Sequence, residues 1–214
     1  MQLSFIDAQA RTLQGGCFRG TRVGACRLLR IAILITGMSI AFSVHLARAQ
    51  PDEGAVINRE YAIKAAYLHN FSSYVQWPAG AFPTSDAPLV IGVLGTDPFG
   101  EVLNEIARTK KVGGRPIVVK QFASMAAYAP CHVLFVASST SPQEQAAAIR
   151  KAHGSPVLLV GENPGFAEQG GAIDFFIEQN KVRFEINLDV AKRQQLKISS
   201  KLLGLAKIVG GQQQ

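Results

Sequence analysis

Cysteine is scarce in this chain and unevenly placed. Of three cysteines in 214 residues, Cys17 and Cys26 fall within the first 49 positions and Cys131 alone follows. A segment with one cysteine cannot form an intramolecular disulfide or a thiolate metal cluster. We therefore expect residues 50–214 to fold without either, with Cys131 as a small core residue in an apolar segment.

Excess positive charge is also confined to the beginning of the chain. The formal net charge is +7, but the first 49 residues hold six arginines and one acidic residue. Residues 50–214 hold sixteen Lys and Arg against fourteen Asp and Glu. A surface so close to neutrality lacks the cationic excess that binding to nucleic-acid phosphates requires. We predict no nucleic-acid partner.

Sequence patterns of catalytic and metal sites are missing. His69, His132 and His153 show neither H-x-x-x-H nor H-E-x-x-H spacing, and the glycines form no G-x-S-x-G, G-x-G-x-x-G or P-loop pattern. Cys131 and His132 are adjacent in an apolar strand, so their side chains point to opposite faces and cannot act as nucleophile and base. We predict a protein without catalytic residues, bound metal or cofactor, and not an enzyme.

The N-terminal segment has the three parts of a secretory signal peptide. Two arginines precede an apolar run at 31–44, which is followed by Ala47-Arg48-Ala49. The run is shorter than the roughly 20 residues of a membrane span, and an A-x-A exit is typical of a cleavage site. We predict a signal peptide over residues 1–49, cleaved between Ala49 and Gln50. A buried helix or an uncleaved anchor is the alternative.

The rest of the chain has the length of one domain. We expect a flexible lead at 50–57, a domain at 58–209 and a tail at 210–214. Apolar runs predict strands at 89–94, 116–122, 131–137, 156–160, 172–178 and 181–186. Helices are predicted at 58–75, 98–109, 124–128, 142–152, 188–195 and 200–209. Their predicted N-caps are Asn58, Asp97, Ser141, Asn187 and Ser199.

This order of elements indicates an α/β fold. Strands separated by short helices imply right-handed crossovers and a mainly parallel sheet. Gln179-Asn180 lies between two strands and predicts a two-residue turn, which adds a C-terminal antiparallel hairpin at one edge. We predict a three-layer sandwich with helices on both faces of the sheet.

The carboxyl ends of the predicted strands offer a candidate ligand crevice. Thr96 and Asp97 follow the first strand, Ser138 follows the third, and Glu162 follows the fourth. Open α/β sheets bind their ligands at this edge, so we predict that these four residues line a crevice. A helix cap for Asp97 and an ordinary turn for Glu162 are the alternative interpretations.

The first predicted helix is unusually aromatic. Five aromatic residues lie within 17 positions: Tyr61, Tyr67, Phe71, Tyr74 and Trp77. A helix that is apolar on more than one side is either sandwiched or meets a partner. Core packing alone is one interpretation. Our hypothesis is that Tyr67, Phe71 and Tyr74 form a protein interface, where aromatic residues are enriched.

Several short segments, taken in order, resemble the YfiR family of periplasmic regulatory proteins over nearly all of residues 58–209. They are 64–71 with Trp77-Pro78, 93–100, 114–117, 131–135, 165–171, 182–187 and 196–203. Each segment is weakly specific alone, but together they keep one register across the domain. The resemblance implies a three-layer α/β domain in the periplasm without enzymatic activity.

The resemblance also implies partners. Such a protein would bind the periplasmic part of a membrane diguanylate cyclase, hold its cytoplasmic domain inactive, lower cyclic-di-GMP and restrain biofilm formation. A hybrid sensor kinase as partner, a small-ligand sensor role and a homodimer are the alternatives. Family members often carry a cysteine near Gly92 that pairs with the one matching Cys131, and some carry another pair within 166–176. These partner cysteines are absent here, so the resemblance does not extend to redox control.

Overall fold

The computed structural model describes residues 53–210, with side chains from residue 59 onward. The predicted signal peptide, its cleavage site at Ala49 and Gln50, and residues 211–214 lie outside this range. None of the helices in the described range is long and apolar enough to cross a membrane.

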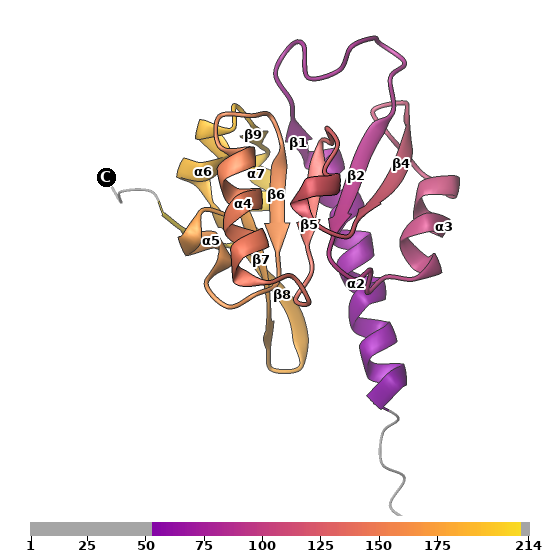
Figure 1. Ribbon diagram of the computed structural model, residues 1–214, viewed down its shortest axis with the longest axis vertical. Coiled ribbons are helices and arrows are strands. Elements are labelled where there is room, and N and C mark those ends of the chain that lie inside the picture. The colour runs from indigo at the N-terminus through magenta and orange to yellow at the C-terminus, as the bar shows by residue number, and fades with distance from the viewer. Residues whose placement is uncertain (1–52, 211–214) are drawn as a thin grey trace, which may run out of the picture. The chain divides into compact units, whose positions relative to one another are not determined.

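Helices and strands alternate through most of the chain (Figure 1). The helices are α2 (Glu53–Tyr74), α3 (Glu101–Thr109), the 3-10 turn η2 (Met125–Ala127), α4 (Pro142–Ala152), α5 (Phe166–Gln169), α6 (Leu188–Arg193) and α7 (Ser200–Leu203). The strands are β1 (Val75–Gln76), β2 (Leu89–Leu94), β3 (Lys111–Val112), β4 (Arg115–Phe122), β5 (Val133–Val136), β6 (Leu158–Gly161), β7 (Ile173–Glu178), β8 (Lys181–Asn187), β9 (Lys197–Ile198) and β10 (Lys207–Val209).

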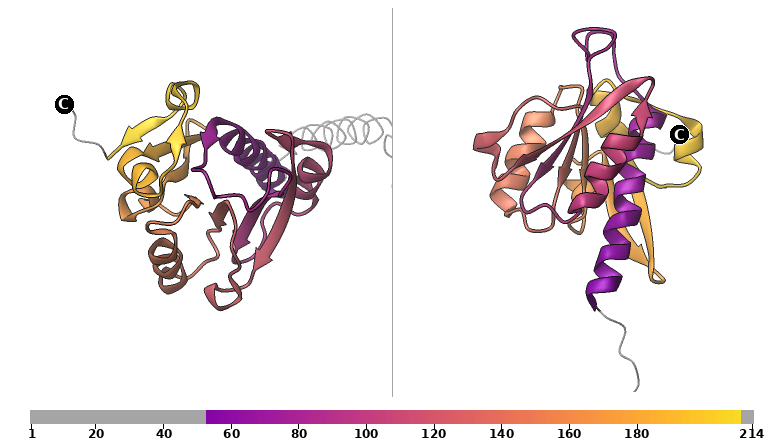
Figure 2. Two further views of the ribbon diagram at one scale, coloured as in Figure 1. Left: turned by 90° about the horizontal axis from the view of Figure 1, so that it is seen from above. Right: turned by 90° about the vertical axis from the view of Figure 1, so that its right-hand side faces the viewer.

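Eight of these strands form one sheet in the order β10-β8-β7-β6-β5-β2-β4-β3. The neighbours from β7 to β4 are all parallel. Antiparallel pairs occur at β7–β8 and β3–β4. The sheet is curled, and α2 lies against its inner face (Figure 2). The predicted α/β class with a mostly parallel sheet is confirmed.

Alternate residues of the central strands supply separate cores on the two faces of the sheet. In β5, Phe135 packs in the cluster that contains Phe71 of α2, whereas its neighbour Leu134 packs with Ala148 of α4 and Phe166 of α5. This division follows from the two-residue period of a strand. Because both faces are covered, β2, β5 and β6 are nearly continuous apolar runs, as the sequence predicts.

The hairpin between β7 and β8 turns at the predicted dipeptide. Gln179 and Asn180 both have positive φ, 49° and 59°, as a type I′ turn requires. The prediction that this hairpin forms an edge is wrong, because β10 pairs in parallel with β8. The predicted helix at 200–209 is correspondingly too long. It ends at Leu203, and residues 207–209 form the edge strand β10 instead.

Two predicted helix starts are wrong. The first helix begins at Glu53 rather than after Asn58, so the predicted lead at 50–57 is helical from Glu53. The second begins at Glu101 with Gly100 at the N-cap. Asp97 instead accepts a hydrogen bond from the Phe99 N–H at 2.8 Å, a local turn that its short carboxylate closes before the helix begins.

Other caps agree with the sequence. The Ser141 hydroxyl accepts from the Glu144 N–H, and the Asn187 side chain accepts from the Val190 N–H at 3.1 Å. The sequence patterns did not predict the short pairs β1–β9 and β3–β4. Strands of two residues are too short to show a period.

We expect Phe71→Ala to lower the free energy of unfolding by about 3–5 kcal/mol, since it removes a buried ring and leaves a cavity. The ring is fully buried and stacks on Phe175 with centroids 5.5 Å apart. Tyr74→Ala is the matched control, because Tyr74 is 41% exposed. It should cost less than about 1 kcal/mol. Urea denaturation measures both, and equal effects would contradict the assignment of Phe71 to the core.

Candidate functional site

Glu162 lies just after β6 and joins the strand ends to α2. Its side chain is 3% exposed. One carboxylate oxygen, Oε2, accepts from Lys64 Nζ at 2.6 Å. The other, Oε1, accepts from the Ser138 N–H at 2.7 Å and from the Tyr61 hydroxyl at 3.3 Å. Glu162 therefore does more than an ordinary turn residue, because it bridges two strand ends and a helix.

Lys64 is the buried cation of this cluster. It is 4% exposed and lies between two carboxylates, with Glu60 at 2.5 Å and Glu162 at 2.6 Å. Burial by itself lowers the pKa of Lys64, but the hydrogen bonds to Glu162 and Glu60 outweigh it and raise the pKa above its usual value. Lys64 is therefore charged at neutral pH, and its burial is tolerable because both neighbours are anions.

The four predicted crevice residues do not all meet. Ser138 and Glu162 are joined directly. The Thr96 N–H donates to the Ser139 hydroxyl at 2.9 Å, so Thr96 is tied to the residue after Ser138. Asp97 Oδ2 accepts from the Gln121 side chain of β4 at 2.6 Å. Sequence reasoning missed Tyr61 and Lys64. The available signal was the spacing of Glu60 and Lys64, four residues apart on an apolar helix.

An acidic cavity of about 500 Å³ opens beside this cluster. Of the four predicted crevice residues, Glu162 lines it. Its other ionisable lining residues are Glu60, Lys64, Glu168, Asp174, Glu185 and Lys207. Carboxylates outnumber lysines in this lining, and its apolar residues include Pro164, Phe175, Phe176 and Ile177.

Asp174 is the most unusual acid of the cavity. It is 3% exposed and faces Glu185 directly across the β7–β8 pair. Its Oδ2 accepts from the Phe166 N–H at 3.0 Å, whereas Oδ1 is buried without a hydrogen-bond partner among the described residues. Burial, aided by the charge of Glu185, raises the pKa of Asp174 to about 7 despite that backbone hydrogen bond. The sequence signal was an aspartate inside an apolar strand.

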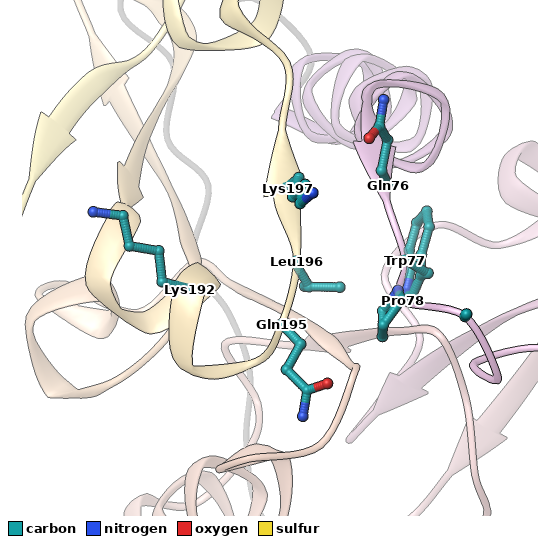
Figure 3. A pocket seen from close by; sticks show the side chains of 8 residues that line it. Gln76, Trp77, Pro78, Lys192, Gln195, Leu196 and Lys197 are labelled. Carbon is teal, nitrogen blue, oxygen red and sulfur yellow. The ribbon is translucent and has the colours of Figure 1, made fainter.

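A second pocket, of about 540 Å³, lies between the end of α2 and the segment after α6 (Figure 3). It is lined by Gln76, Trp77, Pro78, Ala79, Lys192, Gln195, Leu196 and Lys197. Gln195 has a positive φ of 59°, which places it in the left-handed region. The indole N–H of Trp77 is buried without a partner among the described residues. None of the predicted crevice residues lines this pocket.

The three aromatic residues predicted to form an interface separate in the structure. Phe71 is fully buried and belongs to the core, so it cannot form part of a surface. Tyr67 is partly buried, with its ring 5.2 Å from that of Phe184, and lines a groove beside the β7–β8 hairpin. Tyr74 is exposed. The helix is aromatic mainly because the curled sheet surrounds it.

Cys131 is a buried thiol, and burial raises its pKa to about 11. A Cβ atom added at Gly92 would lie 3.2 Å from its sulfur and 2.6 Å from the Phe122 ring. The Phe122 ring therefore occupies the space that a side chain at position 92 would need. Within the described range, no group of three or more His, Cys, Asp or Glu residues could hold a metal ion.

His132 fastens the long loop after β1 to the sheet. Its Nδ1 accepts from the Val90 N–H at 3.0 Å, so the proton is assigned to Nε2, which donates to the Ala81 carbonyl at 3.1 Å. The ring stacks on Phe82 at 4.1 Å, and the Arg115 guanidinium covers the Phe82 ring at 3.9 Å. Burial lowers the pKa of His132. These contacts give the residue a structural role.

Comparison with known protein families identifies a match over most of the chain. A family model described as YfiR/HmsC-like matches residues 61–207. No protein with a curated description matches the chain. Apart from Glu60, the residues of the Glu162 cluster, the acidic cavity and the pocket beside Trp77 all lie within the matched range.

We expect Glu162→Gln to lower the free energy of unfolding by about 3 kcal/mol, because it leaves the buried Lys64 with one anionic partner. Glu105→Gln is the control, since the Glu105–Arg108 pair is exposed. It should cost less than about 1 kcal/mol. A second change, Lys64→Met in the Glu162→Gln background, should recover part of the loss. Denaturant titrations that give equal costs for both single variants would contradict a buried, charged Lys64.

Asp174 predicts a pH dependence of stability. Because its pKa is about 7 in the folded protein and about 4 in an unfolded chain, the folded state binds the proton more tightly. Its contribution is therefore largest at low pH and is lost as pH rises from about 4 to 7, by up to about 4 kcal/mol. Asp174→Asn should abolish this loss and be more stable than the parent at pH 8. Parallel curves of melting temperature against pH for the two proteins would refute it.

Proposed function

The chain belongs to the YfiR/HmsC-like family, and we propose on that basis that it is a periplasmic repressor of a membrane diguanylate cyclase. The observation that carries the proposal is the family match over residues 61–207. Members of the family are regulators rather than enzymes, and the family links the domain in general to diguanylate cyclases. The finer statement is ours: the domain binds the periplasmic part of the cyclase, represses it and lowers cyclic-di-GMP, which restrains biofilm formation.

Export to the periplasm is part of the proposal. The basic flank, short apolar run and A-x-A exit within residues 1–49 support a cleaved signal peptide. The near neutrality of residues 50–214 supports a protein partner rather than a nucleic acid. We also regard the helices on the two faces of the curled sheet as the outer layers of a three-layer α/β sandwich.

Repression by binding has a thermodynamic requirement. A protein that touches only the periplasmic part of its partner can change activity only by binding the inactive state more tightly than the active one. A hundredfold shift between the two states requires a difference of about 2.7 kcal/mol in binding free energy. A few well-packed contacts can supply this difference, so the domain needs no reaction of its own.

A small-ligand sensor is the second candidate function. The acidic cavity of about 500 Å³ beside Glu162 favours it, because ligand sites are concave and combine apolar walls with a few charged groups. A ligand of this cavity would raise the melting temperature with increasing concentration. The periplasmic part of a sensor kinase and a second copy of the chain are the alternative protein partners.

Deletion of the gene should raise cyclic-di-GMP in the native host several-fold. The full chain supplied from a plasmid should restore the low level, and a version lacking residues 2–49 should not. The full chain and the version lacking residues 2–49 contain the same domain and differ only in the segment proposed to direct export. Immunoblots of periplasmic and cytosolic fractions give the location of each version.

The proposal would be falsified by an unchanged cyclic-di-GMP level in the deletion strain. If phosphorylation of a sensor kinase changes while cyclic-di-GMP does not, the partner is the sensor kinase rather than a diguanylate cyclase. Repression by the version without residues 2–49 would place the action inside the cell and contradict the export step.

A further inference from the structure

A groove of about 540 Å³ lies between α2 and the β7–β8 hairpin. In Figures 1 and 2 the N-terminal half of α2 and this hairpin run side by side. The residues that line the groove are Arg59, Glu60, Ile63, Tyr67, Ile177, Asn180, Lys181, Val182 and Arg183. Glu60 and Ile177 line both this groove and the acidic cavity, whereas Lys64, Glu162 and the residues of the pocket beside Trp77 do not line the groove.

Apolar side chains are exposed in this groove. Ile63 is 39% exposed and Ile177 is 51% exposed, on opposite walls. Tyr67 also lines the groove, and its ring packs against the rings of Phe175 and Phe184, at 6.0 Å and 5.2 Å. A fixed aromatic ring flanked by exposed aliphatic side chains is typical of the centre of a protein interface.

The charge of the groove is positive. Three exposed cations line it, Arg59, Lys181 and Arg183. The lining also holds one acid, Glu60, whose partner Lys64 is shared with Glu162, so three cations stand against one carboxylate in the groove. The contact of Arg183 with Glu178 is long, at 3.8 Å, and exposed, so it contributes little. The positive field is local, because residues 50–214 as a whole are close to neutral.

We infer that this groove binds an acidic, amphipathic segment of the membrane partner. Its carboxylates would meet the three cations, and its apolar side chains would pack on Ile63, Tyr67 and Ile177. Arginine suits this role because its guanidinium binds a carboxylate through two parallel hydrogen bonds. The inference rests on the proposed function and names the chemistry of the partner's contact. Of the three aromatic residues in the interface hypothesis, it retains Tyr67.

Synthetic peptides test the chemistry directly. The first alternates Glu with Leu, Ile and Phe; the second replaces each Glu with Lys; the third replaces each apolar residue with Ser. Fluorescence anisotropy with the purified protein should show binding of the first peptide at least tenfold tighter than that of the other two. Binding of the first should also weaken as salt rises, because exposed charges are screened. Equal binding of the first and second peptides would overturn the inference.

Charge reversal locates the binding surface. The triple variant Arg59→Glu, Lys181→Glu and Arg183→Glu should lose at least tenfold in affinity for the first peptide. The control triple variant Lys110→Glu, Lys111→Glu and Lys120→Glu changes the net charge equally at other exposed positions and should bind as the parent does. Equal losses in both variants would overturn the inference. So would loss of a dimer in the first variant without peptide binding by the parent, because the groove would then join two copies of this chain.

The same variants separate this inference from the proposed function. In the deletion strain, the parent and the control variant should restore low cyclic-di-GMP, and the groove variant should not, although immunoblots show all three in the periplasm. If deletion leaves cyclic-di-GMP unchanged, the proposed function fails whatever the peptides show. If deletion raises it and the groove variant represses fully, the function stands and the groove inference fails.

Discussion

The buried ion pair of Lys64 and Glu162 is the contact on which the arrangement of this domain depends. It joins the helix that lies inside the curled sheet to the carboxyl ends of the central strands, across 98 positions of sequence. Apolar packing of residues such as Phe71 holds α2 against the sheet, and the ion pair adds a directional contact to it. A buried charge whose counterion lies at 2.6 Å favours this rotation and register of the helix, because other positions would leave the charge unpaired. The aromatic residues of α2 then face defined neighbours.

The two ends of α2, held in place by this ion pair, have different roles. The half that contains Phe71 is surrounded by the sheet and belongs to the core. The earlier part, with Arg59 and Ile63, stands beside the β7–β8 hairpin and keeps exposed side chains. One helix therefore supplies both core packing and a surface, which explains why it is apolar on more than one side. A regulator that works by contact needs such a surface held rigidly, because a mobile one would lose binding free energy on ordering.

Much of the fold could be predicted from the sequence. The strands covered on both faces are continuous apolar runs, and the two helix caps, Ser141 and Asn187, and the Gln179-Asn180 turn depend only on neighbouring residues. The edge strand at 207–209 could not be predicted, because pairing with β8 overrides the local helical pattern. The start of α2 at Glu53 was not predicted either. Of the candidate site, the position of two residues at neighbouring strand ends could be predicted, but their partners on α2 could not. Ser138 and Glu162 follow strand ends, which the alternation of elements reveals. Lys64 comes from a helix distant in sequence, and only the folded chain brings it there.

The contact of Gly92 with the Phe122 ring has a consequence for how such a protein can be controlled. The Phe122 ring lies 2.6 Å from where a Cβ atom at position 92 would sit, and Cys131 is the one cysteine of the described range, so no intramolecular disulfide can form there. The described domain should keep its shape under oxidants and reductants alike. Noncovalent contacts made by this domain will instead vary in strength with concentration, ionic strength and acidity.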